Sequence, residues 1–421
     1  MRSFFFVVIA IIMTLNLSWY ALSDYWVRRN LADFPEARQM ARWALVLWMA
    51  MILIPIVGMA IPGMGNLLEY GPWLWVAVFN LWMGAIFFWM IGVALIGIPV
   101  WGTGKLMTWW QEKKERAKGE IKTIVGQEEF ANNKEAPGLS RRQLIKLGLV
   151  AAPPLLVSGG AAVSWWNMQR LNVYQVDLPV VDLPYDLEGF TITHLSDIHI
   201  GILTGRERVE KIVAAANSLN SDLAVVTGDI LDQDIAFMPD MVETVGALTA
   251  PLGVYLCIGN HDKIYDADTW ITNVRKAKLN LLLDQGTLID TGKTPLKLLG
   301  IDFAREERFD EININKADGS LAAPENALKI LLAHHPHAFD AAVRTGIPVT
   351  LAGHTHGGQL VLRAGEHLEL FNPGRLLFRY VDGIYRSDQG HTLFVHKGSG
   401  DWFPLRIGAP AEIVQLRLVG V

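Results

Sequence analysis

The stretch Ile347-Pro348-Val349-Thr350-Leu351-Ala352-Gly353-His354-Thr355-His356-Gly357-Gly358 joins an apolar run to a segment of histidine and glycine. The run is typical of a buried strand, and the glycines allow the chain to turn sharply where it ends. Residues two apart in an extended segment point to the same side, so His354 and His356 can face one site. Taken alone, this pattern is only modest evidence for a metal site.

Four earlier strand-like runs also end in polar residues. They are Phe190–Ser196 before Asp197-Ile198-His199, Leu223–Thr227 before Gly228-Asp229, Val254–Ile258 before Gly259-Asn260-His261-Asp262, and Leu328–Ala333 before His334-His335-Pro336-His337. Helical stretches alternate with these runs, which predicts an α/β or layered mixed-sheet domain. The ends of strands are the usual position for site groups in such sheets. Chance would seldom produce five runs that each end in Asp, Asn or His.

This ordered set of Asp-x-His, Gly-Asp, Gly-Asn-His-Asp, His and Gly-His-x-His resembles the calcineurin-like metallophosphoesterases. The resemblance covers roughly residues 190–420, and the segments 196–199 and 353–359 are most similar to the bacterial branch of membrane-associated or exported phosphodiesterases. It implies a four-layer α/β fold with two mixed sheets flanked by helices.

The resemblance also implies a role for each polar residue. One metal ion would be held by Asp197, His199, Asp229 and His356, and the other by Asp229, Asn260, His334 and His354. His261 would lie beside the substrate phosphate, where it stabilises charge or protonates the leaving oxygen. His335 adjoins His334 and leaves a choice of ligand, although the family spacing of His-x-Pro favours His334.

The residue types agree with this chemistry. Two cations about 3.5 to 4 Å apart can activate a bridging water and hold the non-bridging oxygens of a phosphate. Carboxylate, amide and imidazole ligands without thiolate suit Mn, Fe, Zn or Co, and leave the identity of the two divalent ions open. Near the end of the chain, Arg406 follows glycine-rich loops that could bind a phosphate or head group, although ordinary turns explain those loops equally well.

Long uncharged runs in the first half predict membrane spans. Charged residues make up only 19% of the chain, against about 25% in a typical soluble domain. Uncharged runs cover residues 3–23, 43–68, 70–104 and 147–169, and a helix needs about 20 apolar residues to cross a bilayer. The proline and glycine pairs at 153–154 and 159–160 weaken the fourth run. We predict four parts: a three-span module (1–104), a basic cytoplasmic linker (105–142), a fourth span or signal anchor (143–169) and a metallophosphoesterase domain (170–421).

Lysine and arginine flank these runs unevenly. They are absent between the second and third runs and abundant over residues 105–142, which predicts that this linker is cytoplasmic. The catalytic domain of this multi-pass plasma- or inner-membrane protein would then face the periplasm or cell exterior. Arg141 and Arg142 precede the fourth run and resemble a twin-arginine export signal. Two arginines that simply flank a span explain the pair equally well.

Together these features predict a membrane-anchored, metal-dependent hydrolase of phosphoesters, foremost a phosphodiesterase. Anchoring makes a lipid or envelope phosphoester a natural substrate. The alternatives are a phosphomonoesterase or phosphoprotein phosphatase, and a membrane sensor or scaffold without catalysis. The net charge of −5 and the lack of a basic stripe with interleaved aromatics exclude nucleic acid as an expected main partner.

Overall fold

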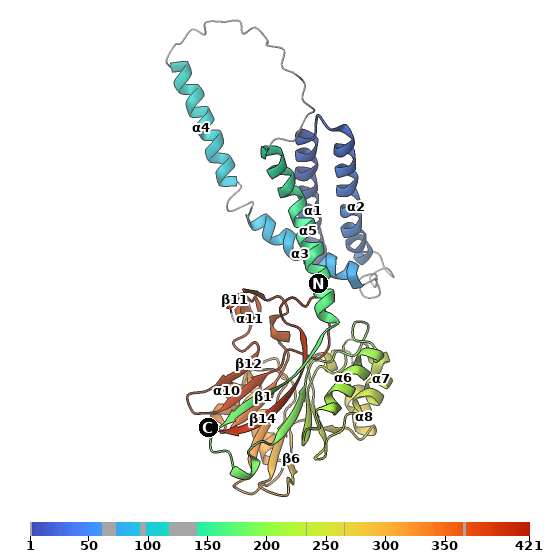
Figure 1. Cartoon of the computed structure of the whole chain (residues 1–421), viewed down its shortest axis with the longest axis vertical. Helices are drawn as coiled ribbons and strands as arrows, with labels where there is room; N and C mark the ends of the chain where they lie inside the picture. The colour runs from blue at the N-terminus through green and yellow to red at the C-terminus, as the bar shows by residue number, and fades with distance from the viewer. Residues whose placement is uncertain are drawn as a thin grey trace. The chain divides into compact units, whose positions relative to one another are not determined.

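A computed structural model describes residues 2–60, 73–92, 98–117, 141–232, 234–264, 266–364 and 368–421. The chain divides into two compact units, Met1–Ala161 and Ala162–Val421, each of which is described by itself (Figure 1). The division falls within the helix that contains the fourth uncharged run. The four domain boundaries proposed from the sequence stay predictions.

The first unit is helical. Its helices are α1 (Arg2–Asn30), α2 (Pro35–Ala60), α3 (Trp73–Gly92), α4 (Ile98–Ala117) and the first part of α5 (Arg141–Met168). Trp19 of α1 packs edge to face against Trp82 of α3, with 4.7 Å between the ring centroids. The buried Trp82 indole donates a hydrogen bond of 2.8 Å to the Asn16 side chain, so both polar groups are satisfied away from water.

Only part of the predicted membrane module is supported by these helices. Among the described residues, one helical segment, Pro35–Ile56, is long and apolar enough to cross a membrane, and Trp75–Ile86 is apolar but shorter. The third uncharged run carries α3, which ends at Gly92, and α4, which begins at Ile98 and continues into the predicted linker. Residues 118–140 of that linker lie outside the described residues. A module of three or four spans therefore stays a prediction.

The second unit contains two six-stranded mixed sheets. The first has the order β1 (Leu171–Val180), β14 (Ala411–Gly420), β2 (Thr191–Leu195), β3 (Leu223–Thr227), β4 (Val254–Cys257) and β5 (Asn280–Leu281). The second has the order β12 (Gly383–Arg386), β13 (Thr392–Val395), β9 (Val349–Ala352), β8 (Leu328–Leu332), β7 (Leu296–Gly300) and β6 (Gln285–Ile289). Strands β2 to β5 run parallel to one another, as do β7, β8, β9 and β13.

Helices cover the outer face of each sheet, as the ribbon shows (Figure 1). Helices α6 (Arg206–Ser218), α7 (Met238–Val245) and α8 (Ala267–Lys276) pack on the first sheet, and α9 (Arg308–Gly319) and α10 (Ala338–Arg344) pack on the second. Successive strand residues point to opposite faces. Val225 accordingly packs between the sheets, whereas Val226 faces the helices, which explains why residues 223–226 of β3 are all apolar. The predicted four-layer α/β arrangement is confirmed.

A small accessory element follows β9. It consists of the antiparallel pair β10 (Leu362–Ala364) and β11 (Leu368–Phe371) and the one-turn helix α11 (Gly374–Leu377). This element lies outside both six-stranded sheets.

Candidate metal centre

The polar residues predicted from the sequence gather where parallel strands of both sheets end. Strands β2, β3 and β4 lead into them from the first sheet, and β8 and β9 from the second. Two backbone hydrogen bonds of 3.0 Å continue the strand pairing into these loops. Asp197 N donates to the Gly228 carbonyl, and Gly353 N donates to the His334 carbonyl. The carboxyl ends of parallel strands meet at one edge, and the side chains of several loops therefore converge there.

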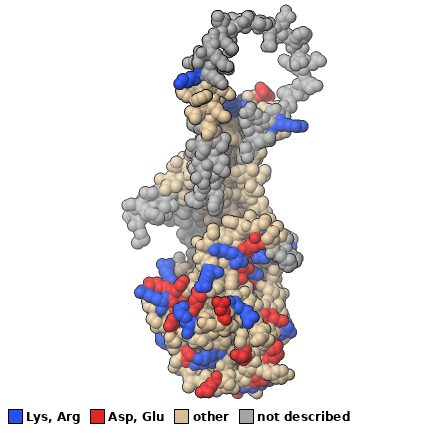
Figure 2. All heavy atoms as spheres, turned by 90° about the vertical axis from the view of Figure 1, so that its left-hand side faces the viewer, with Lys and Arg blue, Asp and Glu red and all other residues tan. Residues whose placement is uncertain are grey.

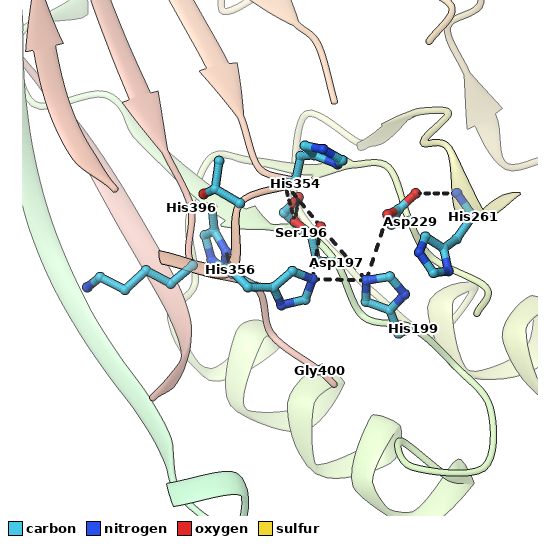
Figure 3. A network of polar contacts seen from close by, with 12 residues as sticks. Ser196, Asp197, His199, Asp229, His261, His354, His356, His396 and Gly400 are labelled. Carbon is cyan, nitrogen blue, oxygen red and sulfur yellow. Dashed lines mark hydrogen bonds and ion pairs between the residues drawn. The ribbon is translucent and has the colours of Figure 1, made fainter. Parts of the chain in front are cut away.

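A first group of side chains surrounds Asp197 (Figure 3). The ligand atoms of Asp197, His199 and His356 all lie within 4.8 Å of one another. His356 Nε2 is 3.4 Å from Asp197 Oδ1 and 3.1 Å from His199 Nε2. His199 Nε2 is also 3.7 Å from Asp229 Oδ2, so the carboxylate of Asp229 reaches this group.

A second group lies on the other side of Asp229. His334 Nε2 is 3.1 Å from Asp229 Oδ2 and 3.1 Å from Asn260 Oδ1. The Nδ1 atom of His354 is 3.2 Å from the same His334 nitrogen. The structure thus brings together all seven residues predicted as ligands, and Asp229 contacts both groups.

Two glycines allow the strand ends to approach this closely. A Cβ atom on Gly259 would lie 2.1 Å from Asp229 Oδ1 and 2.3 Å from the Asp229 backbone nitrogen. A Cβ atom on Gly353 would lie 1.9 Å from Ser196 Oγ and 2.3 Å from Asp197 Oδ2. Neither position has room for a side chain, so these glycines are required by close packing against the site.

Residues 190–358, which carry both groups, match the family model described as calcineurin-like phosphoesterase. These residues belong to the calcineurin-like phosphoesterase family. The family predicted from the ordered motifs is therefore confirmed.

Two relatives of this chain have the word transmembrane in their names. The chain is 31% identical over 260 residues to "Transmembrane protein with metallophosphoesterase domain" from Danio rerio, covering 59% of this chain and 58% of that protein. The protein of the same name from Bos taurus is 31% identical over 265 residues, with 58% and 56% covered. "Uncharacterized metallophosphoesterase YkuE" from Bacillus subtilis (strain 168) is 28% identical over 294 residues, with 66% and 98% covered. The chain thus spans somewhat more than half the length of the first two relatives.

The backbone of the calcineurin-like site is strained at five of the seven predicted ligands. Their φ angles are positive: Asp197 51°, His199 49°, Asp229 49°, His354 73° and His356 49°. Non-glycine residues rarely adopt this left-handed conformation, which costs about 1–3 kcal/mol for each residue and is concentrated at functional sites. The surrounding fold therefore holds these side chains in orientations that the local sequence would not favour.

Burial and neighbouring charges set the protonation of the cluster. Burial, with the nearby His334, lowers the pKa of His354 to about 3. Burial also opposes the charged form of His334, but the Asp229 and Asp197 carboxylates outweigh it and raise the pKa of His334 to about 9. Burial would raise the pKa of Asp229, yet its histidine neighbours hold it below the usual range. The site thus combines the neutral imidazole of His354 with the ionised carboxylate of Asp229, which attracts cations.

The donor set fits two divalent cations. His199 Nε2 and His356 Nε2 face each other at 3.1 Å and offer two nitrogen lone pairs to one point beside Asp197. His334 Nε2 and His354 Nδ1 lie 3.2 Å apart beside the Asn260 amide oxygen. Carboxylate, imidazole and amide atoms converge in each group without thiolate, which is the donor chemistry of Mn, Fe, Zn and Co sites. The two groups of the calcineurin-like domain therefore suit a dinuclear divalent metal site.

The structure distinguishes between the two adjacent histidines. His334 is 2% exposed and contacts Asp229, whereas His335 stacks on His354 with ring centroids 3.9 Å apart. His335 also packs against Phe303 and belongs to none of the three possible metal-binding groups found among the described residues. The geometry therefore favours His334 as the ligand.

The prediction that Arg406 binds substrate is corrected by the structure. Its side chain is fully buried and pairs with Asp401, and its remaining N–H groups donate to backbone carbonyls and to His356 Nδ1. All of the guanidinium donors are thus used inside the protein. Arg406 supports the far side of the His356 ring, where no substrate can reach it.

Asp232 is a site residue that the sequence analysis missed. Its Oδ1 atom is 3.0 Å from His261 Nδ1 and 3.6 Å from His199 Nδ1. Burial opposes the charged form of His261, but hydrogen bonding to Asp232 and the charge of Asp229 raise its pKa. A carboxylate three residues after Asp229 was the available signal. Asp232 therefore orients the ring of His261 and stabilises its protonated form.

The metal groups open into a cavity of about 300 Å³. His261 and His354 line this cavity, and so do Leu377, Phe378 and Trp402. The predicted catalytic residue is therefore accessible from the cavity, whereas the innermost ligands Asp197 and His199 are buried. The lining thus includes three large apolar side chains, which a site for small, fully charged phosphates would not require.

Proposed function

We propose that this chain is a membrane-anchored, metal-dependent phosphoester hydrolase that acts as a phosphodiesterase on lipid or envelope phosphoesters. The first ion would be held by Asp197, His199, Asp229 and His356, and the second by Asp229, Asn260, His334 and His354. When bound, the pair would polarise the phosphoryl group, neutralise its charge and lower the pKa of a water molecule.

The position of Asp229 is the observation that carries the proposal. Its Oδ2 atom is 3.7 Å from His199 in one group and 3.1 Å from His334 in the other. The Oδ1 atom accepts a hydrogen bond of 2.8 Å from the His261 backbone nitrogen, which fixes the carboxylate between the groups. A single carboxylate shared by two ligand sets supports a two-metal site.

The chain itself supplies a proton donor. His261 borders the cavity and is held by Asp232 on its Nδ1 side, which leaves Nε2 available to a substrate oxygen. The Asp232 carboxylate beside Nδ1 favours the protonated ring. We assign to His261 the binding of a phosphoryl oxygen and donation of the proton to the leaving oxygen.

Hydrolysis of two chromogenic esters tests this function. The full chain, purified in detergent and loaded with manganese, is expected to hydrolyse bis-p-nitrophenyl phosphate faster than p-nitrophenyl phosphate. Asp229→Asn preserves the side-chain shape but weakens both ligand sets, and should abolish the activity. Ile312→Ser, at an exposed site on α9, serves as the matched surface control.

The other functional classes predict different results. Faster hydrolysis of the monoester would assign the chain to the phosphomonoesterases or phosphoprotein phosphatases. If the metal-loaded chain hydrolyses neither ester, and Asp229→Ala and His261→Ala behave like wild type, the domain is a sensor or scaffold without catalysis.

The uneven distribution of lysine and arginine supports a catalytic unit outside the cytoplasm. A cysteine introduced at the exposed position Ile312 should then react with an impermeant thiol reagent in intact cells. The native Cys257 is buried and should not react. Exchange of Arg141 and Arg142 for lysine keeps the charge but removes a twin-arginine signal. Normal labelling of that variant would show that the pair only flanks a span.

A further inference from the structure

The accessory element beside the metal centre exposes an unusual set of large apolar side chains. Six of them come from β10, β11 and α11, and together we call them the apolar rim: Leu362, Leu368, Leu370, Phe371, Leu376 and Leu377. Leu370, Leu376 and Leu377 are 63%, 81% and 79% exposed. Single exposed leucines are ordinary, but a concentration of them marks a surface that contacts a partner or a membrane.

The apolar rim is fixed directly to the metal loop. The Asn372 side chain, between β11 and α11, donates to the Gly357 carbonyl, one residue after the ligand His356. A Cβ atom on Gly358 would lie 2.0 Å from Asn372 Oδ1, so the two segments are in tight contact. Leu377 belongs to the rim and also lines the cavity. The exposed apolar surface is therefore continuous with the apolar wall of the site.

Next to the rim, two arginines pair with two carboxylates that are less exposed than they are. Arg363 and Arg375 pair with Glu369 and Asp382, and in every pair the arginine is the more exposed partner. The side chains of Arg363 and Arg375 are 34% and 46% exposed, against 23% for Glu369 and 12% for Asp382. Guanidinium groups thus lie outward at the edge of an apolar surface, as in proteins whose basic side chains meet lipid phosphates. Basic and acidic residues are interspersed over the face that Figure 2 shows.

Two exposed tryptophans, Trp165 and Trp166, lie on the last turn of α5, directly before β1 of the catalytic unit. Within this unit, the last turn of α5 is bonded to the loop that carries Trp402, since Ser164 Oγ accepts from Arg406 N and Asn167 donates to the Arg406 carbonyl. Trp165 and Trp166 are 41% and 58% exposed on the same turn. Exposed tryptophans next to an apolar helix are typical of the membrane–water interface.

We infer that the apolar rim inserts into the surface of an anionic bilayer and admits a lipid phosphoester to the metal centre from its acyl side. This inference rests on the proposed function, because the lipid is taken as substrate. Acyl chains would lie along Leu377, Phe378 and Trp402 of the cavity wall. The phosphate would reach His261, and the arginines would remain among the head groups.

Insertion is measured separately from catalysis. The full chain carrying Leu370→Cys, labelled with a fluorescent thiol reagent, is reconstituted into vesicles of phosphatidylethanolamine and phosphatidylglycerol with nitroxide-labelled acyl chains. Ile312→Cys, 59% exposed on α9, is the matched control. We expect strong quenching at position 370 and little at position 312. Equal quenching at the two positions would overturn the inference, whether or not the protein is active.

A second experiment links the rim to the substrate. The variant Leu368→Ser/Leu370→Ser/Leu376→Ser should cleave a fluorescent phosphatidylglycerol in these vesicles about tenfold or more slowly, because three side chains lose contact with the lipid. Its kcat/KM for the soluble bis-p-nitrophenyl phosphate should be unchanged, as should both activities of Ile312→Ser.

Three other results have distinct meanings. Unchanged lipid cleavage by the triple variant refutes the inference. If the same substitutions convert an oligomer to a monomer, and position 370 is not quenched, the rim binds a second copy of the chain. A wild-type protein that hydrolyses no ester but inserts at position 370 would refute the proposed function and keep the docking surface.

Discussion

Replacement of Gly259 by alanine is a direct test of the shared carboxylate, because it adds a single methyl group next to it. The new Cβ atom would lie 2.1 Å from Asp229 Oδ1, whereas such atoms essentially never come within 3.0 Å of another heavy atom. The carboxylate must therefore move by about 1 Å, and the 2.3 Å approach to the Asp229 nitrogen prevents the backbone from accommodating the methyl group. Misplacement by about 1 Å at a catalytic centre can reduce the rate about 10²-fold.

The steady-state kcat/KM for bis-p-nitrophenyl phosphate, measured on the manganese-loaded chain, is expected to fall by about 10²-fold in Gly259→Ala. Bound metal, measured by mass spectrometry, should fall as well. Overpacking should also lower the free energy of unfolding by about 1–3 kcal/mol. Asp229→Asn, which adds no volume, should lose activity with a smaller loss of stability, so that misfolding and loss of the ligand can be separated.

Gly319→Ala is the matched control. Gly319 ends α9, and an added Cβ atom there would meet nothing within 4 Å. This variant should keep wild-type kcat/KM and should be as stable as wild type or more stable by up to about 1 kcal/mol. If Gly259→Ala also kept wild-type kcat/KM and metal content, Asp229 could not be the shared ligand, and the two-metal proposal would be wrong.

Three further predictions concern other parts of the site and fold. Asp232→Asn should lower kcat about 10- to 10²-fold with little change in KM, because His261 loses the partner that holds it protonated. Adding His261→Asn should then lower kcat little further, which a double-mutant cycle would show. Chelation by EDTA should lower the Tm in a thermal scan, because the ligand groups lose the ions that bind only the folded state, and manganese should restore both Tm and activity. Asp318→Asn should destabilise the fold by about 2 kcal/mol in urea unfolding without changing kcat/KM, because it leaves the 4%-exposed Lys297 without its carboxylate partner. Its two lysine partners outweigh burial and lower the pKa of Asp318 in the folded state, so this stabilisation is present at neutral pH and is lost as the pH falls through that lowered pKa.

Local patterns were sufficient to predict the five strands that lead into the cluster, and the cluster itself. Apolar runs such as Leu223–Thr227 form buried strands, and the polar residues that follow them converge because parallel strands end at one edge. The sequence did not distinguish the contacts that depend on packing between distant segments. Arg406 follows loops that look suitable for phosphate, yet its partner Asp401 and the ring of His356 enclose it.

Other features were not predicted for the same reason, namely that they depend on packing between distant segments. Asp232 follows Asp229 by three residues, but only the folding of two loops brings it to His261. The apolar rim was equally hidden, since the exposure of Leu370 and Leu376 depends on how β11 and α11 pack on the metal loop.

The order of the first sheet has a consequence for biosynthesis. Strand β14, Ala411–Gly420, lies between β1 and β2 and pairs with β1 along its whole length, although every predicted ligand precedes it in the chain. A nascent chain that has already produced His356 still lacks an interior strand, and β1 and β2 have no common neighbour until residue 420 has emerged from the ribosome. The first sheet is therefore complete only after β14 has been translated, and we expect a product that stops before β14 to be degraded by proteases.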